Sequence, residues 1–205
     1  MKLTRKEQAT EARRKLIDAA TKLISEKDYS QITISDLTKA CGMSAGNFYH
    51  YFESKEDVFV ALEREPFDSL LATMNDHPHE AAAYQLAYYL KHYISLSMTI
   101  YGANFSRQWF RYHIEDAITS PPRPNKMDMA KREVIAILNH GIAKGELIEE
   151  TPVEDLAFQI ACMVYGVSLY SVMDTNQFDL VKWIDNTADS FVETLLQPYL
   201  KKQPV

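Results

Sequence analysis

Closely spaced helix-start signals near the N-terminus constrain this chain to a group of very short helices. Two of the signals are capping boxes and one is a single serine cap: Thr33 with Asp36, Ser54 with Asp57, and Ser44. In a capping box each side chain bonds the backbone N–H of the other residue, and a helix starts there. Gly42 lies between the Thr33 and Ser44 signals and is expected to end the helix that starts at Ile34. The spacing therefore predicts a helix from Ile34, a second over 45–51 and a longer third helix.

A further helix is predicted over 10–26, in front of these three. Leu16, Ala20 and Leu23 recur there at three- and four-residue spacing, which places them in one apolar stripe. The small unit needs an interior, and we expect it to come from Ile34, Leu37, Ala40, Phe48 and Phe52.

The helix over 45–51 displays Asn47, Tyr49 and His50 on a face with little apolar character. A short helix with such a face, supported by the helix before it, is how helix-turn-helix proteins enter the major groove of DNA. The Asn47 amide can pair with the donor and acceptor edge of adenine, which makes it the best base reader. The alternative is an ordinary exposed asparagine. A helical dimer that binds only a protein partner would not need this display.

The remaining sequence also has helical spacing, without sustained strand-like alternation. After the helix that starts near 55, we predict helices over 80–101, 105–118, 127–144, 152–173 and 178–201, with the clearest loop over 120–125. Pro66 is expected either to kink or to end its helix. The expected fold is all-α, with a three-helix helix-turn-helix domain over 1–55 and a larger helical domain over 56–205.

The last two predicted helices are the most apolar part of the chain. Between residues 160 and 173 only glycine and serine interrupt the apolar residues, so this helix must be buried on several sides. The final helix carries an apolar stripe at helical spacing, formed by Val181, Ile184, Ala188, Phe191, Leu195 and Tyr199. Two such helices offer a surface for self-association. The apolar run over 160–173, of 14 residues, is too short to span a bilayer.

Charge is divided unevenly along the chain, whose net charge is −6. Residues 1–55 hold ten Lys or Arg against seven Asp or Glu, a balance of +3. The other residues hold twelve against twenty-one, a balance of −9. This division suggests a basic module attached to an acidic body, although helical surfaces also vary in charge by chance.

Signals of export and of enzymes are weak. Cys41 and Cys162 lie far apart and suggest no disulfide framework, so a reduced cytoplasmic setting is expected. The charged start of the chain does not look like a secretory signal. His77 and His79, with Asp76 and Glu80, could suggest a metal site, but beside Pro78 they favour a solvated loop. We see no glycine-rich phosphate loop or nucleophile elbow, and we expect no metal, cofactor or catalytic residue.

Over residues 10–62 the chain resembles the TetR family of transcriptional repressors. The resemblance lies in three runs: Cys41-Gly42-Met43-Ser44, Phe48-Tyr49-His50-Tyr51-Phe52, and Ser54-Lys55-Glu56-Asp57-Val58. It implies a bacterial, cytoplasmic homodimer whose C-terminal domain binds a ligand and dimerises through the last two helices, 152–173 and 178–201. It further implies a repressor that holds a near-palindromic operator in double-stranded DNA and is released by a small effector.

The resemblance also implies which residues contact DNA. Its motif positions correspond here to Thr33, Ser44, Ala45, Gly46, Asn47, Tyr49, His50 and Lys55. Ser44 and the free N–H groups at Ala45 suit a phosphate, Tyr49 and His50 the sugar–phosphate backbone, and Lys55 a phosphate clamp. The family often has a basic residue where this chain has Ala45. We therefore expect basic residues of an N-terminal arm or the first helix to compensate, namely Arg5, Lys6, Arg13 and Arg14.

The effector pocket is predicted from the aromatic residues of the central helices. The residues expected to line it are Tyr89, Tyr93, Phe105, Trp109 and Tyr165. Such rings suit an apolar or aromatic ligand, although an aromatic stripe is also typical of plain core. The acidic body favours a neutral or cationic ligand over an anion.

Overall fold

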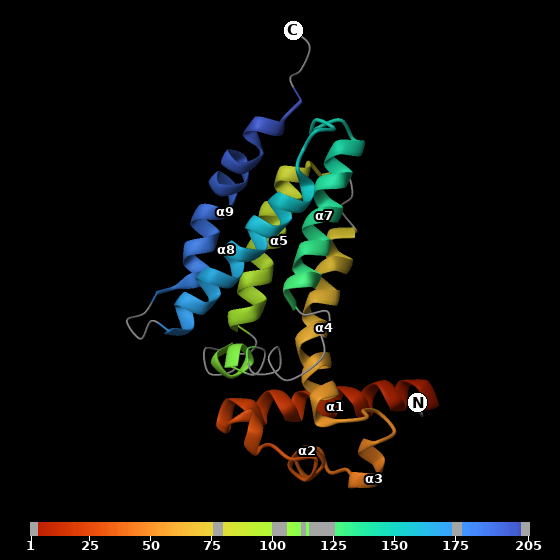
Figure 1. The fold of residues 1–205 in the computed structure, drawn as a ribbon. Helices are drawn as coiled ribbons and strands as arrows, with labels where there is room; N and C mark the ends of the chain where they lie inside the picture. The colour runs from red at the N-terminus through yellow and green to blue at the C-terminus, as the bar shows by residue number, and fades with distance from the viewer. Residues whose placement is uncertain are drawn as a thin grey trace. The chain divides into compact units, whose positions relative to one another are not determined.

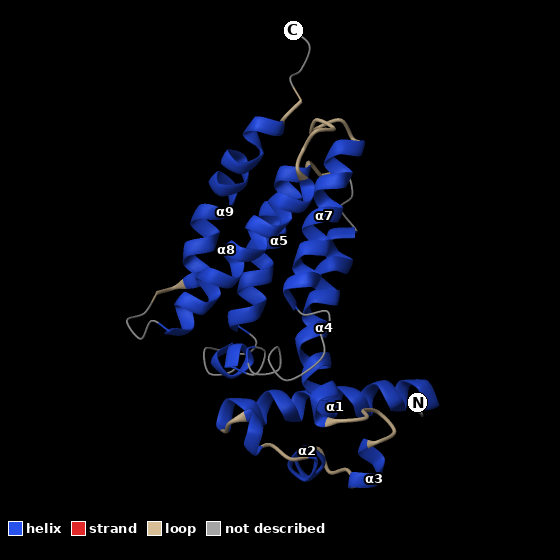
Figure 2. Cartoon of the chain, in the orientation of Figure 1, coloured by secondary structure: helices blue, strands red, loops and turns tan. Residues whose placement is uncertain are grey.

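The computed structural model describes residues 4–75, 80–99, 106–111, 114, 126–173 and 178–201. The named helices are α1 (Arg5–Glu26), α2 (Ile34–Ala40), α3 (Ala45–Phe48), α4 (Lys55–Asn75), α5 (Ala82–Thr99), α7 (Lys126–Ala143), α8 (Val153–Met173) and α9 (Leu180–Leu196). In this described part the only β-type pairing is an isolated bridge between Leu147 and Leu200 (Figure 2). The all-α prediction is confirmed.

The chain divides into two compact units, Met1–Ser69 and Leu70–Val205. The division falls within α4, so the first unit keeps most of that helix. The proposed domain bounds, 1–55 and 56–205, remain a prediction. Pro66 does not end its helix, because α4 continues through it to Asn75.

The first helix begins earlier than predicted. Thr4 and Glu7 form a capping box, in which Thr4 N–H donates to Glu7 Oε2 at 2.7 Å and Glu7 N–H donates to the Thr4 hydroxyl at 3.3 Å. The first turn is polar, so apolar periodicity alone could not find it. As a consequence Arg5 and Lys6 belong to α1 instead of a separate arm.

The predicted caps of the short helices are all present. Thr33 and Asp36 form the capping box of α2, and the Ser44 hydroxyl accepts from the N–H of Asn47. Gly42 has a φ of +68° and ends α2. The Met43 N–H then donates back to the Thr38 carbonyl at 2.8 Å, which closes a Schellman turn.

Two details of this unit differ from prediction. The helix expected over 45–51 ends at Phe48, because the N–H groups of His50 and Tyr51 donate to carbonyls only three residues back. Ala40 is exposed at the end of α2 and does not join the core. Of the expected interior residues, Leu37, Phe48 and Phe52 are buried and Ile34 is half-buried.

The second unit contains α5, α7, α8 and α9, in which α5 packs against α9 and α7, and α7 packs against α8 (Figure 1). Its core includes Leu86, Leu90 and Ile94 of α5, Leu138 of α7, Ile160 of α8 and Ile184 of α9. The helix predicted over 105–118 is described only at 106–111 and 114, where it is helical. The predicted loop over 120–125 lies outside the described residues.

One residue, Glu146, ties together the ends of three helices in this unit through its carboxylate and its backbone. Glu146 Oε2 accepts from the N–H of Ala82, at the start of α5, at 2.7 Å. The Glu146 N–H donates to the Gly141 carbonyl of α7, and the Glu146 carbonyl accepts from Lys201 N–H, just beyond α9. Gly145, with a φ of +72°, supplies the left-handed turn that brings Glu146 there.

Helix α8 has 21 residues, more than the apolar run that sequence patterning assigned to it. By length and composition it is the one described helix that could cross a membrane, which is weak evidence because core helices of soluble proteins pass the same test. Only 33% of its most apolar stretch is buried within this chain. Much of its apolar surface therefore remains uncovered.

Replacing Gly141 with alanine should destabilise the second unit. A Cβ at this position would lie 2.7 Å from Ala82 Cβ, which is bonded directly to the backbone of α5 and cannot rotate away. Overpacking costs about 1–3 kcal/mol, whereas alanine gains about 1 kcal/mol in helix propensity. We expect a net loss in the free energy of unfolding by urea. The double change with Ala82→Gly should recover part of it, and an equal loss in both variants would contradict the steric explanation.

Candidate nucleic-acid interface and ligand cavity

Helix α3 is anchored by one side chain and presents the others. Phe48 is completely buried and packs against Phe52, with ring centroids 6.0 Å apart. Around this anchor Ser44, Ala45, Gly46 and His50 are exposed, Tyr49 is 60% exposed and Asn47 is half-buried. The structure thus brings six of the predicted contact residues together on one short helix and its flanks.

The start of α3 suits close approach by another molecule. Backbone N–H groups in the first turn of a helix have no carbonyl partner within that helix. No atom would lie within 4 Å of a Cβ at Gly46, so the space around this turn is open. The small side chains of Ala45 and Gly46 leave the backbone there accessible.

Thr33 has a structural role at the start of α2. Its hydroxyl donates to Asp36 Oδ2 at 2.8 Å, and its N–H donates to the same oxygen at 2.9 Å. Lys27, the C-cap of α1, pairs with Asp36 at 3.0 Å. The hydrogen bonds from Lys27 and then Thr33 hold the pKa of the Asp36 carboxyl far below its usual value. The end of α1 and the start of α2 therefore share one ion pair.

Lys55 is also engaged within the first unit. Its ammonium donates to the carbonyls of Tyr29 and Ile32 at 3.2 and 3.0 Å, and lies 4.4 Å from the centre of the Tyr29 ring. The Tyr29 hydroxyl in turn donates to Glu56 at 2.8 Å. Because an ammonium has three N–H donors, one remains for a partner such as a phosphate.

The four expected basic compensators differ in their surroundings. Arg13 pairs with Glu65 and lies over the Phe52 ring, 5.0 Å from its centre. Arg14 pairs with Glu11 at 3.0 Å, one turn earlier on α1. Arg5 and Lys6 are exposed in the first turn of α1.

The predicted aromatic pocket residues form a packed group. Tyr89, Tyr93 and Trp109 are buried, and Trp109 contacts Tyr165 edge-on with centroids 5.8 Å apart. Burial raises the pKa of Tyr89 strongly, and the negative charge of Glu133 raises it further. Phe105 lies outside the described residues.

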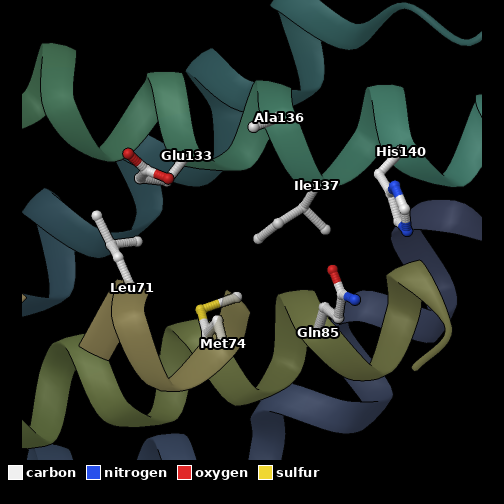
Figure 3. A pocket seen from close by; sticks show the side chains of 7 residues that line it. All are labelled: Leu71, Met74, Gln85, Glu133, Ala136, Ile137 and His140. Carbon is white, nitrogen blue, oxygen red and sulfur yellow. The ribbon is translucent and has the colours of Figure 1, made fainter. Parts of the chain in front are cut away.

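The structure contains a cavity of about 370 Å³ within the second unit (Figure 3). Its lining residues come from α4, α5 and α7: Leu71, Met74, Gln85, Glu133, Ala136, Ile137 and His140. A smaller cavity of about 150 Å³ shares Met74 and Gln85 and adds Glu80, Tyr84 and Tyr88. Of the five predicted pocket residues, the four that the structure describes do not line either cavity, so that pocket remains a prediction.

The residues that line this cavity were not predicted from the sequence, although the spacing of four of them along α7 indicates that they share one helix face. Glu133, Ala136, Ile137 and His140 are spaced by three, one and three residues, which places all four on one helix face. Glu133 and His140 place a carboxylate and an imidazole on this otherwise apolar face, where they are candidate polar contacts for a ligand. Among the described residues no group of three metal-ligating side chains occurs, and Asp76, His77 and His79 lie outside them.

Comparison with known proteins places the first unit in a family. The model of bacterial regulatory proteins of the tetR family matches residues 16–62, which include α2, α3 and the start of α4. The first unit thus resembles the tetR family of bacterial regulatory proteins. The Bacillus subtilis fatty acid metabolism regulator protein is 34% identical over 67 residues, 33% of this chain and 34% of that protein. The chain thus spans about a third of that relative.

Other TetR-family proteins resemble longer parts of the chain. The Staphylococcus epidermidis regulator IcaR, a negative transcriptional regulator of the biofilm operon icaADBC, is 25% identical over 119 residues, 52% of this chain and 63% of that protein. These relatives are named as regulators of transcription.

Solved structures extend the likeness to the whole fold. A TetR-family regulator from Cytophaga hutchinsonii has a TM-score of 0.67 at 19% identity, covering 99% of this chain and 100% of its own. FadR from Bacillus subtilis, solved with stearoyl-CoA, has a TM-score of 0.64 at 22% identity. The likeness covers 87% of this chain and 96% of the FadR chain. At these identities the likeness concerns the fold alone.

The Asp36 ion pair predicts a pH dependence. A carboxyl whose pKa is lowered by folding adds stability above its unfolded value of about 3.9, and this contribution is lost as the pH falls. Asp36→Asn should therefore unfold at lower urea than the natural protein at pH 7, and the difference should shrink below about pH 4. Asp18→Asn, at an exposed position of α1, is the control. A difference that stayed constant with pH would contradict this account.

Proposed function

We propose that this chain regulates transcription as a member of the TetR family: it binds a near-palindromic operator as a homodimer, acts as a repressor, and is released by a small effector. The observation that carries the proposal is the exposed face of α3, held by the buried Phe48 and the Ser44 cap. A four-residue helix has little stability of its own, so its rigid support is explained best by a need to present its outer face.

Each exposed residue of this face has a chemical role in the proposal. The first-turn N–H groups and the Ser44 hydroxyl bind a phosphate, and the Asn47 amide reads a base. Tyr49 and His50 contact the sugar–phosphate backbone, together with Thr33 and the third donor of Lys55. The methyl group of Ala45 suits contact with a thymine methyl.

The dimer surface of the proposal is the outer face of α8. Its exposed residues recur at spacings of four, four, three and four: Phe158, Cys162, Gly166, Leu169 and Met173. Phe158 is 53% exposed and Met173 is 71% exposed, which is costly for apolar side chains in water. The small residues Cys162 and Gly166 stand in the middle of the stripe, where a second α8 could approach closely. A second copy of the chain is the occupant with a matching apolar face.

Induction in this proposal is a population shift. An effector that prefers a form of the dimer with unsuitable operator spacing lowers DNA affinity by the ratio of its affinities for the two forms. Helix α4 is the covalent path for the change, since its last turns belong to the second unit and include Leu71 and Met74 of the cavity.

DNA binding is tested by fluorescence anisotropy with the DNA that flanks the chain's own gene. Asn47→Ala should weaken sequence-specific binding by about thirtyfold or more, because the proposed dimer loses two bidentate base contacts of about 1–3 kcal/mol each. Binding to unrelated DNA should change little. An unaltered preference for the flanking DNA would remove Asn47 as a base reader, and no selective binding by a folded dimer would refute the proposed function.

The role of the exposed basic residues at the start of α1 is tested by measuring how DNA affinity depends on salt concentration. Because the proposed dimer carries two copies of each residue, Arg5→Ala with Lys6→Ala should lower affinity and reduce the slope of log affinity against log salt by roughly three to four units. The charge-matched control is Lys182→Ala with Lys201→Ala, at exposed positions of the second unit. If both pairs changed the slope equally, the effect would reflect net charge and not a phosphate contact.

The dimer is tested by cross-linking through its own cysteine. In a Cys41→Ser background, mild oxidation should join two chains through Cys162, which is exposed at the centre of the apolar stripe. Leu169→Glu should give monomers in analytical ultracentrifugation and abolish the cross-link. Val60→Glu, at an exposed apolar position of α4 in the first unit, is the control and should leave the dimer intact. A monomeric natural protein at micromolar concentration would refute the α8 interface.

A further inference from the structure

Arg13 and Glu65 continue the buried faces of two helices of the first unit. Arg13 lies three to seven positions before buried residues of α1, namely Leu16, Ile17 and Ala20. Glu65 lies three to seven positions after buried residues of α4, namely Val58, Ala61 and Leu62. Residues at these spacings share one face of a helix. Both charged side chains therefore lie at the edge of the core, where each residue is half-buried.

The two side chains meet and form an ion pair between α1 and α4. The Arg13 guanidinium donates to Glu65 Oε1. The central carbon of the same guanidinium lies 5.0 Å from the centre of the Phe52 ring. A guanidinium is planar and carries five N–H donors, so it can stack on a ring while it bonds a carboxylate. Arg13 therefore links Glu65 of α4 to Phe52.

Phe52 continues this link to α3. It is buried, and its ring packs against Phe48 with centroids 6.0 Å apart. The Phe52 N–H also donates to the Phe48 carbonyl at 3.1 Å. Phe48 is the buried anchor of α3, so a chain of contacts runs from Glu65 through Arg13 and Phe52 to the helix that displays the proposed DNA-binding face.

This arrangement gives Arg13 a different role from the one that the sequence predicts. The sequence predicts a DNA contact, yet the guanidinium is directed to Glu65 and Phe52. Arg14 is the contrasting case on the same helix, since it pairs one turn back with Glu11 and its side chain is 62% exposed. A partly exposed ion pair adds little to the free energy of unfolding. The contacts of Arg13 therefore matter more for where Phe52 lies than for whether the unit folds.

We propose that Arg13 is a positioning residue for DNA recognition, which Glu65 holds over Phe52 so that Phe48 and the exposed face of α3 keep one placement. The inference deepens the proposed function and rests on it for the consequence in DNA binding. Because α3 has only four residues, its placement depends on the side chains against which it packs. Apparent DNA affinity falls in proportion to the fraction of chains that keep this placement.

The placement of α3 is tested first without DNA, by hydrogen exchange and mass spectrometry on the full chain. Glu65→Gln removes the charge and keeps the shape. It should speed exchange in residues 44–52 by about threefold or more, while the urea midpoint changes little. Glu26→Gln makes the same charge change at an exposed position of α1 and should leave exchange in this segment unchanged.

The consequence for recognition is tested by anisotropy with the flanking DNA and with unrelated DNA. Loss of a negative charge in Glu65→Gln would by itself strengthen binding to both DNAs. A positioning role predicts the opposite for the flanking DNA, so the ratio of the two affinities should fall by about three- to tenfold. Arg13→Gln should lower this ratio equally and leave the salt slope unchanged. Lys22→Gln, at an exposed position of α1, is its charge control and should leave the ratio unchanged.

A direct phosphate contact by Arg13 gives a different result. Arg13→Gln would then reduce the slope of log affinity against log salt and leave the ratio of affinities unchanged. The double variant, Arg13→Gln with Glu65→Gln, tests whether the two residues act as one unit. In that case it should lose no more selectivity than either single variant, whereas losses that multiply would show two independent effects.

The outcomes separate this inference from the proposed function. Unchanged exchange over residues 44–52 in Glu65→Gln, an unchanged ratio of affinities, or multiplied losses in the double variant would overturn it. No selective binding by the natural protein would refute the proposed function and the consequence for DNA. The exchange rates would still decide whether the ion pair holds α3.

Discussion

Side-chain caps are the interactions on which the first unit depends. Helices of seven and four residues, α2 and α3, are far below the length of about 12–15 residues at which isolated helices become stable in water. They persist because Thr33, Asp36 and Ser44 bond their first N–H groups and because Phe48 is fully buried. Since α3 is fixed from one side only, its other side is available for recognition. One face of α3 is therefore held by the core, and the opposite face is exposed for the proposed recognition of DNA.

The second unit uses the same chemistry over a longer sequence distance. Glu146 follows a Schellman turn at the end of α7, yet its carboxylate bonds the start of α5, 64 residues away. Lys144 pairs with this carboxylate, while the backbone of Glu146 bonds Lys201 after α9. The ends of α5, α7 and α9 are thereby fixed at one point. Gly141 and Ala82 approach closely next to this point, and the cavity residues His140 and Gln85 lie within a turn of them.

Caps and turns that depend on neighbouring residues could be predicted from the sequence, whereas contacts between residues distant in the sequence could not. The caps at Thr33, Ser44 and Ser54, and the turn at Gly42, depend on residues within a few positions, and all of them are present. The partners of Lys55 and Glu146 are distant in sequence, so the carbonyls that Lys55 bonds and the helix start that Glu146 caps were not foreseen. Tyr89 and Tyr93, which were expected to line a pocket, are buried, and their role in ligand binding stays a prediction. The larger cavity is lined in part by α7 residues whose spacing alone does not show which neighbour they face.

Charge differs between the two proposed binding regions. DNA binding requires positive charge on the first unit, whereas the two cavities, lined in part by Glu133 and by Glu80, lie in the acidic second unit. A balance of +3 over residues 1–55 and −9 over the rest matches this division. An effect of a bound ligand on DNA binding would pass through a change in the structure of the chain. Helix α4 is the covalent element that can transmit this change, because it continues through Pro66 from the first unit to Leu71 and Met74 of the cavity.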